Sequence, residues 1–336
     1  MPLSIGWSGG LFLKTELATF HFDPRSKNNG ANYKFISHSH GDHLSGLNTL
    51  MNNYITPETQ DILFHRYNLS RSHFSIIPYK KRLRFDTLEI TAHNAGHILG
   101  SAQYEINTPS TTCVYTGDIN CVNMLTTTSA EAIQCDILIM ESTYGHPNYV
   151  FPSFGEICSN MVTWALNCVN KEIIPVFQVY STGKAQEVNK IFNTFTKLPV
   201  VVTPSIAKVN KAYEKNNIAL SYCCSNTDEG QALLNKKHCV FLSSKFSNDL
   251  PKNSFLTAAA TGWAYTSWTN KYDAAFPLSG HADFKQLVNY AKNVNPKKVL
   301  TLHGFKDEFA AYLTKKVGIN AQPITASMQK QLFEYV

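Results

Sequence analysis

The sequence predicts an α/β protein whose core is built from both ends of the chain, with an inserted α/β segment between them. In the first part of the chain, short apolar runs typical of buried strands end at motifs that contain His or Asp. A strand–helix–strand order follows in the middle, which favours a parallel sheet. A last apolar run, 299–302, again ends at a histidine. We therefore expect strands alternating with helices up to about residue 145, an inserted α/β segment at 146–265, and a return of the chain to the core at 266–336.

The most informative motif is the hexad His38-Ser39-His40-Gly41-Asp42-His43, which follows the strand-like run 33–37. Three imidazoles and a carboxylate on a tight turn at a strand end cannot all enter a packed core. Imidazole nitrogen and carboxylate oxygen are ligands that Zn²⁺ prefers. A single histidine is often an ordinary core residue, but gathering four such groups without a use is costly. The hexad therefore predicts a site for one or two Zn²⁺ ions.

Three further candidate ligands each follow a strand-like run. His97 comes after the run 83–90, Asp118 ends a strand that begins at residue 113, and His303 follows the run 299–302. Because a strand end presents its next residue at the edge of a sheet, this shared placement favours a common site. A lone His97 or His303 would otherwise be as typical of a surface histidine as of a ligand.

Composition and charge narrow the class of protein. With 336 residues, 43% of them hydrophobic, the chain can bury a sizeable core. It contains no run of about 18 apolar residues, so we expect no membrane span, and its N-terminus lacks the features of a signal peptide. Its eight cysteines show no paired framework and no C-x-x-C pair, which is typical of reduced thiols in a cytoplasmic protein and assigns no metal to cysteine.

The net charge of +6 favours a polyanionic partner. The densest basic run is Lys80-Lys81-Arg82 with Arg84, just before a strand. This run is either a nucleic-acid contact or a solvated strand edge that is protected against pairing.

These motifs resemble those of the metallo-β-lactamase superfamily and, more narrowly, those of the β-CASP nucleases. The resemblance covers nearly the whole chain and includes the string Gly183-Lys184-Ala185-Gln186-Glu187, which is similar to a signature of the β-CASP cap. The segments most similar to the compact set called ligase-associated DNA exonucleases are 6–10, 56–59, 66–67 and 96–103. The resemblance implies a four-layered αββα core with an inserted α/β cap.

The resemblance also implies two metal sites that share one carboxylate. One Zn²⁺ would be bound by His38, His40, His97 and Asp118. A second Zn²⁺ would be bound by Asp42, His43, Asp118 and His303. Mn²⁺ is the alternative metal. Asp23, before Pro24, matches the position that orients a ligand histidine by a hydrogen bond.

The same resemblance implies catalytic and substrate-binding residues. Glu141 ends a hydrophobic strand, and His281 lies in a Gly-flanked loop. In β-CASP nucleases the matching Glu and His face each other, so that a charged imidazole protonates the leaving oxygen. The candidate catalytic residues are Asp42, Glu141 and His281. The candidate phosphate contacts are Ser101, Ser142, Lys184 and Ser279.

The resulting hypothesis is a zinc-dependent nuclease that hydrolyses DNA, as an exonuclease on single strands or ends, in repair or processing. A DNA ligase or helicase is the implied protein partner. The first alternative is an RNA-processing ribonuclease, because Glu141 and His303 match the pattern of the RNA enzymes. A lactonase or thioesterase would keep the hexad without needing the cap. A non-catalytic scaffold would not need every ligand position to be filled.

Overall fold

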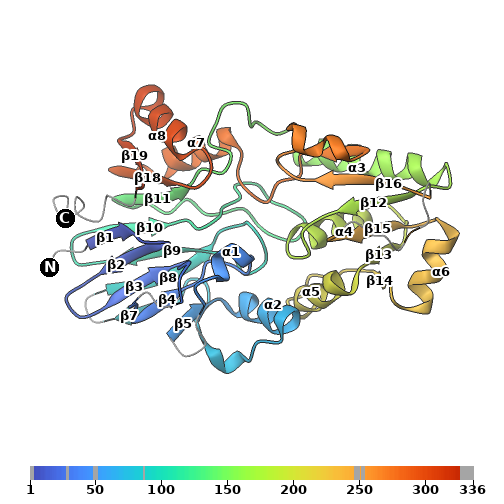
Figure 1. Ribbon diagram of the computed structural model, residues 1–336. Coiled ribbons are helices and arrows are strands. Elements are labelled where there is room, and N and C mark those ends of the chain that lie inside the picture. The colour runs from blue at the N-terminus through green and yellow to red at the C-terminus, as the bar shows by residue number, and fades with distance from the viewer. Residues whose placement is uncertain are drawn as a thin grey trace. The chain divides into compact units, whose positions relative to one another are not determined.

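The computed structural model describes residues 4–27, 30–47, 52–85, 88–245, 250 and 254–325. The chain divides into two compact units (Figure 1). Unit 1 consists of Met1–Asn123, Ser129–Val150 and His281–Val336. Unit 2 consists of Met124–Thr128 and Phe151–Gly280. Both ends of the chain therefore belong to unit 1.

The first sheet of unit 1 has the strand order β1-β2-β3-β4-β5-β6. Its strands are β1 (Ser4–Trp7), β2 (Leu11–Lys14), β3 (Thr19–Phe22), β4 (Tyr33–Phe35), β5 (Asn52–Ile55) and β6 (Phe74–Ile76). The pairs β1/β2 and β2/β3 are antiparallel, whereas β3 to β6 pair in parallel. The carboxyl ends of β3 to β6 therefore lie at one edge, and the hexad follows β4 there.

The second sheet of unit 1 has the strand order β19-β18-β11-β10-β9-β8-β7. Its strands are β7 (Arg82–Phe85), β8 (Leu88–Asn94), β9 (Ala102–Asn107), β10 (Thr112–Tyr115), β11 (Ile137–Glu141), β18 (Lys298–Leu302) and β19 (Ala321–Pro323). The strands β10, β11, β18 and β19 pair in parallel. Asp118, Glu141 and His303 thus all lie at or just beyond the carboxyl ends of parallel neighbours.

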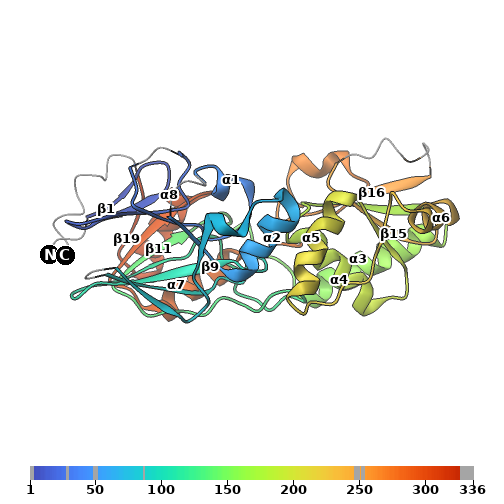
Figure 2. The same cartoon turned by 90° about the horizontal axis from the view of Figure 1, so that it is seen from below.

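Unit 1 has four layers (Figures 1 and 2). Apolar side chains of both sheets pack between them, among them Phe22, Phe35, Tyr104 and Ile139. On the outer face of the first sheet lies α2 (Pro57–Tyr67), whose Leu63 packs with Ile36 and Ile55. The outer face of the second sheet is covered by α7 (Phe284–Val294) and α8 (Lys306–Tyr312). This order confirms the predicted αββα core.

The short helical elements of unit 1 are α1 (Gly41–Leu44), η1 (Arg71–His73) and η3 (Leu313–Val317). The hexad itself contributes α1, which has no side-chain cap at His40. No helix in the described residues is long and apolar enough to span a membrane.

Unit 2 is built on one parallel sheet with the order β14-β13-β15-β12-β16-β17. Its strands are β12 (Ile174–Gln178), β13 (Val200–Val202), β14 (Cys223–Cys224), β15 (Val240–Ser243), β16 (Phe255–Ala260) and β17 (Ala274–Phe276). Its helices are α3 (Phe154–Val169), α4 (Lys184–Phe195), α5 (Pro204–Lys215), α6 (Asp228–Lys236) and η2 (Ser267–Lys271). Two hydrophobic clusters cover this sheet. The cluster that contains Met161 of α3 and Val188 of α4 lies on one face of the sheet, and the cluster that contains Leu234 of α6 lies on the other face.

The structure differs from the sequence-based expectations in three places. The expected alternation of strands and helices up to residue 145 is wrong for most of that stretch, because antiparallel neighbours such as β8, β9 and β10 need only short turns. The run 83–90 spans two paired strands, since Phe85 pairs with Leu88. The compact units also place residues 266–280 with unit 2, where β17 pairs with β16.

Candidate metal centre

Metal-type side chains from separate segments converge at one end of the two sheets of unit 1. Among the residues that the structure describes, three groups each have donor atoms that lie within 4.8 Å of one another. The first consists of His38, His40, His97 and Asp118; the second of His43, Asp118 and His303; the third of Asp118, Glu141 and His281. Asp118 belongs to all three groups and is therefore the centre of the arrangement.

The donor atoms of the first group have the spacing of a tetrahedral ion site. His40 Nδ1 lies 3.0 Å from His38 Nε2 and 3.1 Å from His97 Nε2. Oδ2 of Asp118 lies 3.5 Å from His38 Nε2 and 3.8 Å from His97 Nε2. Because Zn–N bonds of about 2.0–2.1 Å at tetrahedral angles separate two ligand atoms by about 3.3 Å, these residues fit one Zn²⁺ ion.

Burial keeps His38, a member of the first group, in the neutral form that binds a metal. His38 has no exposed surface. Burial, followed by the neighbouring imidazole of His43, holds the pKa of His38 well below its usual value. The imidazole is therefore neutral near pH 7, which is the form that binds a metal.

The second group brings His43 and His303 to the other side of Asp118. His43 Nε2 lies 3.4 Å from Oδ2 of Asp118 and 3.6 Å from Oδ2 of Asp42. The side chain of Asp42 is 72% exposed, and in the described part of the chain it belongs to none of the converging groups. His303 adopts a left-handed backbone conformation, with φ of 62°, directly after β18. Burial lowers the pKa of His303, which again favours the neutral imidazole.

Asp23 fixes the orientation of His43. The carboxylate accepts a hydrogen bond from His43 Nδ1 at 2.8 Å, which leaves Nε2 as the nitrogen that faces Asp118. Asp23 is held in turn by Ser37, whose backbone N–H and hydroxyl donate at 2.7 and 2.6 Å, and by the Tyr115 hydroxyl at 2.9 Å. The structure thus places Asp23 beside a candidate ligand histidine, and its role in metal binding stays a prediction.

The loop that carries His97 is held by hydroxyl groups. The buried Ser101 hydroxyl accepts from the backbone N–H of His97 at 3.0 Å and of Ile98 at 3.2 Å. The carbonyl of Gly100 accepts from Thr56 at 2.7 Å and from Thr59 at 3.0 Å. Gly100 has φ of +79°, and a Cβ there would lie 2.5 Å from the backbone nitrogen of Thr59.

These contacts give a physical role to the string 56–59, which sequence reasoning used only for the resemblance. The start of α2 holds the His97 loop in place. A serine or threonine at a helix start is common, so the sequence carries no signal for this longer-range contact.

Glu141 and His281 form a hydrogen-bonded pair beside the metal-type groups. His281 Nδ1 lies 2.9 Å from Oε1 of Glu141, while its Nε2 lies 4.0 Å from Oδ2 of Asp118. Glu141 is fully buried and also accepts from the backbone N–H of Ile119 at 2.7 Å and from the hydroxyl of Thr143. The arrangement leaves one imidazole nitrogen of His281 facing the candidate metal centre.

The candidate phosphate contacts lie in four different settings. The hydroxyls of Ser101 and Ser142 are buried, and that of Ser142 lies 2.9 Å from the carbonyl of Leu302 and 2.8 Å from that of His303. Lys184 and Ser279 belong to unit 2. The ammonium group of Lys184 donates to the carbonyl of Leu278 at 2.5 Å, and burial lowers its pKa to about 8. Ser279 is partly exposed.

The basic run at the start of β7 pairs with acidic side chains of unit 1. Lys80 contacts Glu131 at 3.0 Å, and Arg82 and Arg84 contact Glu89 at 2.9 and 2.8 Å. Because β7 is the last strand of its sheet, these contacts favour the interpretation as a solvated strand edge.

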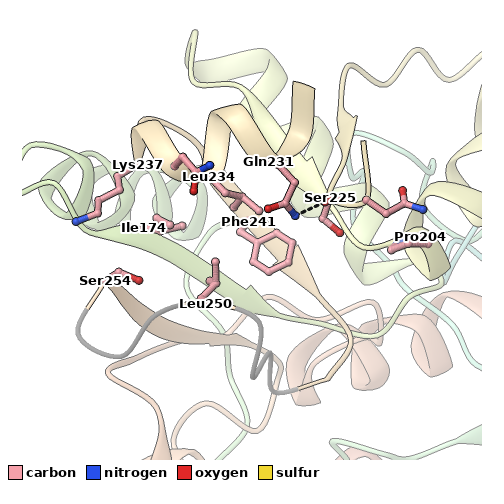
Figure 3. Close-up of a pocket in the computed structure, with 11 residues that line it drawn as sticks. Ile174, Pro204, Ser225, Gln231, Leu234, Lys237, Phe241, Leu250 and Ser254 are labelled. Carbon is pink, nitrogen blue, oxygen red and sulfur yellow. Dashed lines mark hydrogen bonds between the residues drawn. The ribbon is translucent and has the colours of Figure 1, made fainter. Parts of the chain in front are cut away.

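Unit 2 contains a pocket of about 350 Å³, and none of the lining residues that the structure describes belongs to the three groups of candidate metal ligands (Figure 3). Ile174, Leu234 and Phe241 give it apolar walls, and Gln231 donates to the carbonyl of Ser225 at 2.6 Å. Its described lining contains no His, Cys, Asp or Glu, so the pocket offers none of these ligand types to a metal.

The αββα core and the converging His and Asp residues are typical of the metallo-hydrolase class. A family model described as a beta-lactamase superfamily domain matches residues 7–172. A second model, described as a Zn-dependent metallo-hydrolase RNA specificity domain, matches residues 274–322. The chain belongs to the metallo-β-lactamase superfamily and, within it, to the β-CASP group. The predicted resemblance is thereby confirmed.

Individual relatives have names that refer to both DNA and RNA. The chain is 31% identical over 346 residues to a probable DNA ligase of Opitutus terrae, an alignment that covers 99% of this chain and 32% of that protein. It is 23% identical over 357 residues to an RNase J-like protein of Methanocaldococcus jannaschii, covering 84% of this chain and 83% of that protein. The chain thus spans about a third of the Opitutus relative but most of the Methanocaldococcus one.

A solved structure has the same fold. The crystal structure of a protein of unknown function from Enterococcus faecalis aligns with a TM-score of 0.70 at 16% identity, covering 97% of this chain and 98% of that one. At this identity the likeness concerns the fold alone.

Proposed function

We propose that this chain is a zinc-dependent nuclease that hydrolyses DNA phosphodiester bonds, as an exonuclease on single strands or ends, in DNA repair or processing. The observation that carries this proposal is the Glu141–His281 pair, whose second imidazole nitrogen, Nε2, lies 4.0 Å from Oδ2 of Asp118. A hydrolase of lactones or thioesters would need the metal ligands but no such pair. When a phosphodiester is hydrolysed, the 3′-oxygen is a poor leaving group as an alkoxide, and protonation by a positioned imidazole speeds its departure from phosphorus.

The first two groups are assigned to two Zn²⁺ ions. One ion would be bound by His38, His40, His97 and Asp118. The other would be bound by His43, Asp118 and His303, with Asp42 at the exposed side. Zinc in such a site supplies water that ionises near neutral pH and compensates negative charge on a phosphoryl oxygen.

The protein's own residues complete the reaction. Asp23 keeps Nε2 of His43 directed at Asp118. Glu141 holds His281 through Nδ1 and favours the charged imidazolium, so that Nε2–H is directed toward the centre. His281 then donates this proton to the departing 3′-oxygen, and the products carry a 5′-phosphate and a 3′-hydroxyl.

The choice of DNA is supported by the relative named as a probable DNA ligase, in which a region similar to nearly all of this chain is joined to further sequence. A nuclease in one polypeptide with a ligase could trim ends before they are sealed, and a DNA ligase or helicase is the protein partner we propose. The RNase J-like relative and the family model described as an RNA specificity domain support RNA as the second candidate.

Cleavage assays separate these candidates. The purified zinc-loaded protein would be incubated with end-labelled single-stranded DNA, tailed duplex DNA and RNA of matched sequence, each with and without a chelator. We expect chelator-sensitive cleavage of single-stranded DNA or of single-stranded ends, with binding that weakens as salt rises. Cleavage of RNA much faster than that of DNA would contradict DNA as the substrate and support the second candidate, an RNA-processing ribonuclease. Hydrolysis of a lactone or thioester without cleavage of nucleic acid would contradict both.

A further inference from the structure

Unit 2 presents exposed aromatic side chains at one edge of its sheet. Four of the ten residues 263–272, which connect β16 to β17, are Trp or Tyr. Tyr180 follows β12, the parallel neighbour of β16, so both segments leave the sheet at the carboxyl ends of adjacent strands. Such edges are common ligand sites in α/β sheets. We define the aromatic face as Tyr180, Tyr265, Trp268, Lys271 and Tyr272.

The rings of this face are exposed to an unusual degree. Tyr180 is 75% exposed, Tyr265 is 66% exposed and Trp268 is 52% exposed. Leaving an aromatic ring exposed to water is unfavourable in free energy. A cluster of exposed rings at a surface is therefore typical of a binding site.

A basic side chain lies among these rings. Lys271 Nζ lies 4.8 Å from the ring centre of Trp268 and 5.3 Å from that of Tyr272. The two rings are themselves 5.8 Å apart. The adjacent Asp273 carboxylate accepts hydrogen bonds from the backbone N–H and the hydroxyl of Thr257, at 2.7 and 2.9 Å. Flat aromatic faces beside a positive charge match an unpaired base beside its phosphate.

The backbone holds the face in a fixed conformation. Successive turns are closed by hydrogen bonds from Thr266 N–H to the carbonyl of Trp263, from Thr269 N–H to that of Thr266 and from Tyr272 N–H to that of Thr269, at 3.0, 3.1 and 3.0 Å. The Tyr272 hydroxyl donates to Gln178 of β12 at 2.5 Å. A segment that is already ordered loses little entropy when a ligand binds, which favours affinity.

We propose that the aromatic face binds single-stranded nucleic acid, with unpaired bases stacked on Trp268 and Tyr265 and with Lys271 beside a phosphate. This inference rests on the proposed function, since it takes the substrate to be nucleic acid. It extends that function by assigning residues of unit 2 that hold the unpaired strand. Stacking tolerates any base, so binding should show little sequence preference.

Binding measurements test this face independently of cleavage. The zinc-loaded full chain would be titrated into a fluorescent thymidine oligonucleotide with phosphorothioate linkages, which resist hydrolysis, and into a duplex of the same length. Trp268→Ala and Tyr265→Ala should each weaken single-strand binding by about 5- to 100-fold, the usual effect of losing one stacked base. Trp268→Phe should restore most of the affinity, because the ring remains.

The chain offers matched controls. Phe195, at the end of α4 in the same unit, is 52% exposed, the same fraction as Trp268. Phe195→Ala should leave single-strand affinity unchanged. Lys271→Ala should lower this affinity, whereas the same change at Lys211, an exposed lysine of α5 in unit 2, should not. Single-strand affinities of Trp268→Ala and Tyr265→Ala within twofold of Phe195→Ala would overturn the proposal. So would a wild-type chain that binds the duplex as tightly as the single strand.

Kinetics distinguish failure of this inference from failure of the proposed function. If the nuclease assignment holds, Trp268→Ala should raise KM for single-stranded DNA and leave kcat unchanged. If that variant cleaves single-stranded DNA with a normal KM, the role of the aromatic face in binding is contradicted and the proposed nuclease function still stands. Tight single-strand binding that depends on Trp268, without cleavage of any nucleic acid, would support the face and contradict the proposed function.

Discussion

Nδ1 of His281 lies 2.9 Å from Oε1 of Glu141, and the other nitrogen of the same ring lies 4.0 Å from Oδ2 of Asp118. The Glu141 carboxylate also accepts the backbone N–H of Ile119, the residue next to Asp118. One buried carboxylate therefore positions both the candidate general acid and the segment that carries the shared candidate ligand. This relationship makes it possible to separate the chemistry from metal binding by mutation.

His281→Ala should keep the metal content and the affinity for nucleic acid, while cleavage falls by about 10²- to 10⁴-fold, the usual range for general acid catalysis. Glu141→Gln should show a milder loss, because the imidazole remains but loses its charged partner. Replacing the scissile 3′-oxygen by sulfur, a leaving group that needs no proton, should shrink both defects. Cleavage by His281→Ala at the wild-type rate, or loss of an ion in that variant, would contradict the assigned role.

Asp118→Ala should lose more metal than any other single ligand change, because Asp118 belongs to every converging group. Elemental analysis after dialysis would measure the ions retained per chain, which we expect to be close to two zinc ions in the wild type. Asp42→Ala is the matched control, since its exposed carboxylate lies near the second group only. Full metal retention by Asp118→Ala would disprove the shared position.

Ser142→Ala should destabilise the position of His303, because the buried hydroxyl lies 2.8 Å from the carbonyl of His303 and 2.9 Å from that of Leu302. We expect the free energy of unfolding to fall by about 0.5–1.5 kcal/mol, with weaker metal retention and unchanged KM. Urea unfolding, metal analysis and kinetics would measure the three effects. A raised KM with normal stability and metal content would instead indicate the phosphate contact that the sequence suggested for Ser142.

His21 should make the stability of unit 1 sensitive to acid. Its ring lies 5.7 Å from that of Phe12, and in the described part of the chain its Nδ1 has no hydrogen-bond partner. Burial, followed by the charge of Lys34, lowers the pKa of His21 from 6.5 to about 4. The unfolded chain therefore binds the proton at a higher pH than the folded one, and stability that is complete above pH 6.5 is lost as the pH falls toward 4.

The size of this effect is about 2 kcal/mol between pH 7.5 and pH 5. His21→Phe keeps an aromatic ring beside Phe12 but cannot titrate, so urea unfolding of the variant should lose that much less stability over the same interval than the wild type does. Other histidines titrate equally in both proteins, and the difference isolates His21. Equal pH dependence of the two unfolding free energies would refute the assignment.

The α/β class, the hexad and the candidate ligands could be predicted because each depends on a local pattern. The hexad gathers its ligand types within six residues, and His97, Asp118 and His303 each follow a recognisable strand. The run 83–90 shows the limit of this approach, since an apolar stretch does not reveal that Phe85 pairs with Leu88. For the same reason, the sequence left two interpretations of the basic run beside β7 open, a nucleic-acid contact and a solvated strand edge. The ion pairs of its basic residues with Glu89 and Glu131, which the structure shows, favour the strand edge.

The sequence by itself therefore determined the family, the fold class and the inventory of chemically suitable residues, because these depend on residue type and short-range spacing. Only the tertiary structure decided that Ser142 contacts the backbone of His303, that Thr56 and Thr59 hold the loop of His97, and that exposed rings follow adjacent strands of unit 2. These relationships depend on which strands become neighbours in a sheet. Strand order is set by long-range packing, which no local pattern specifies.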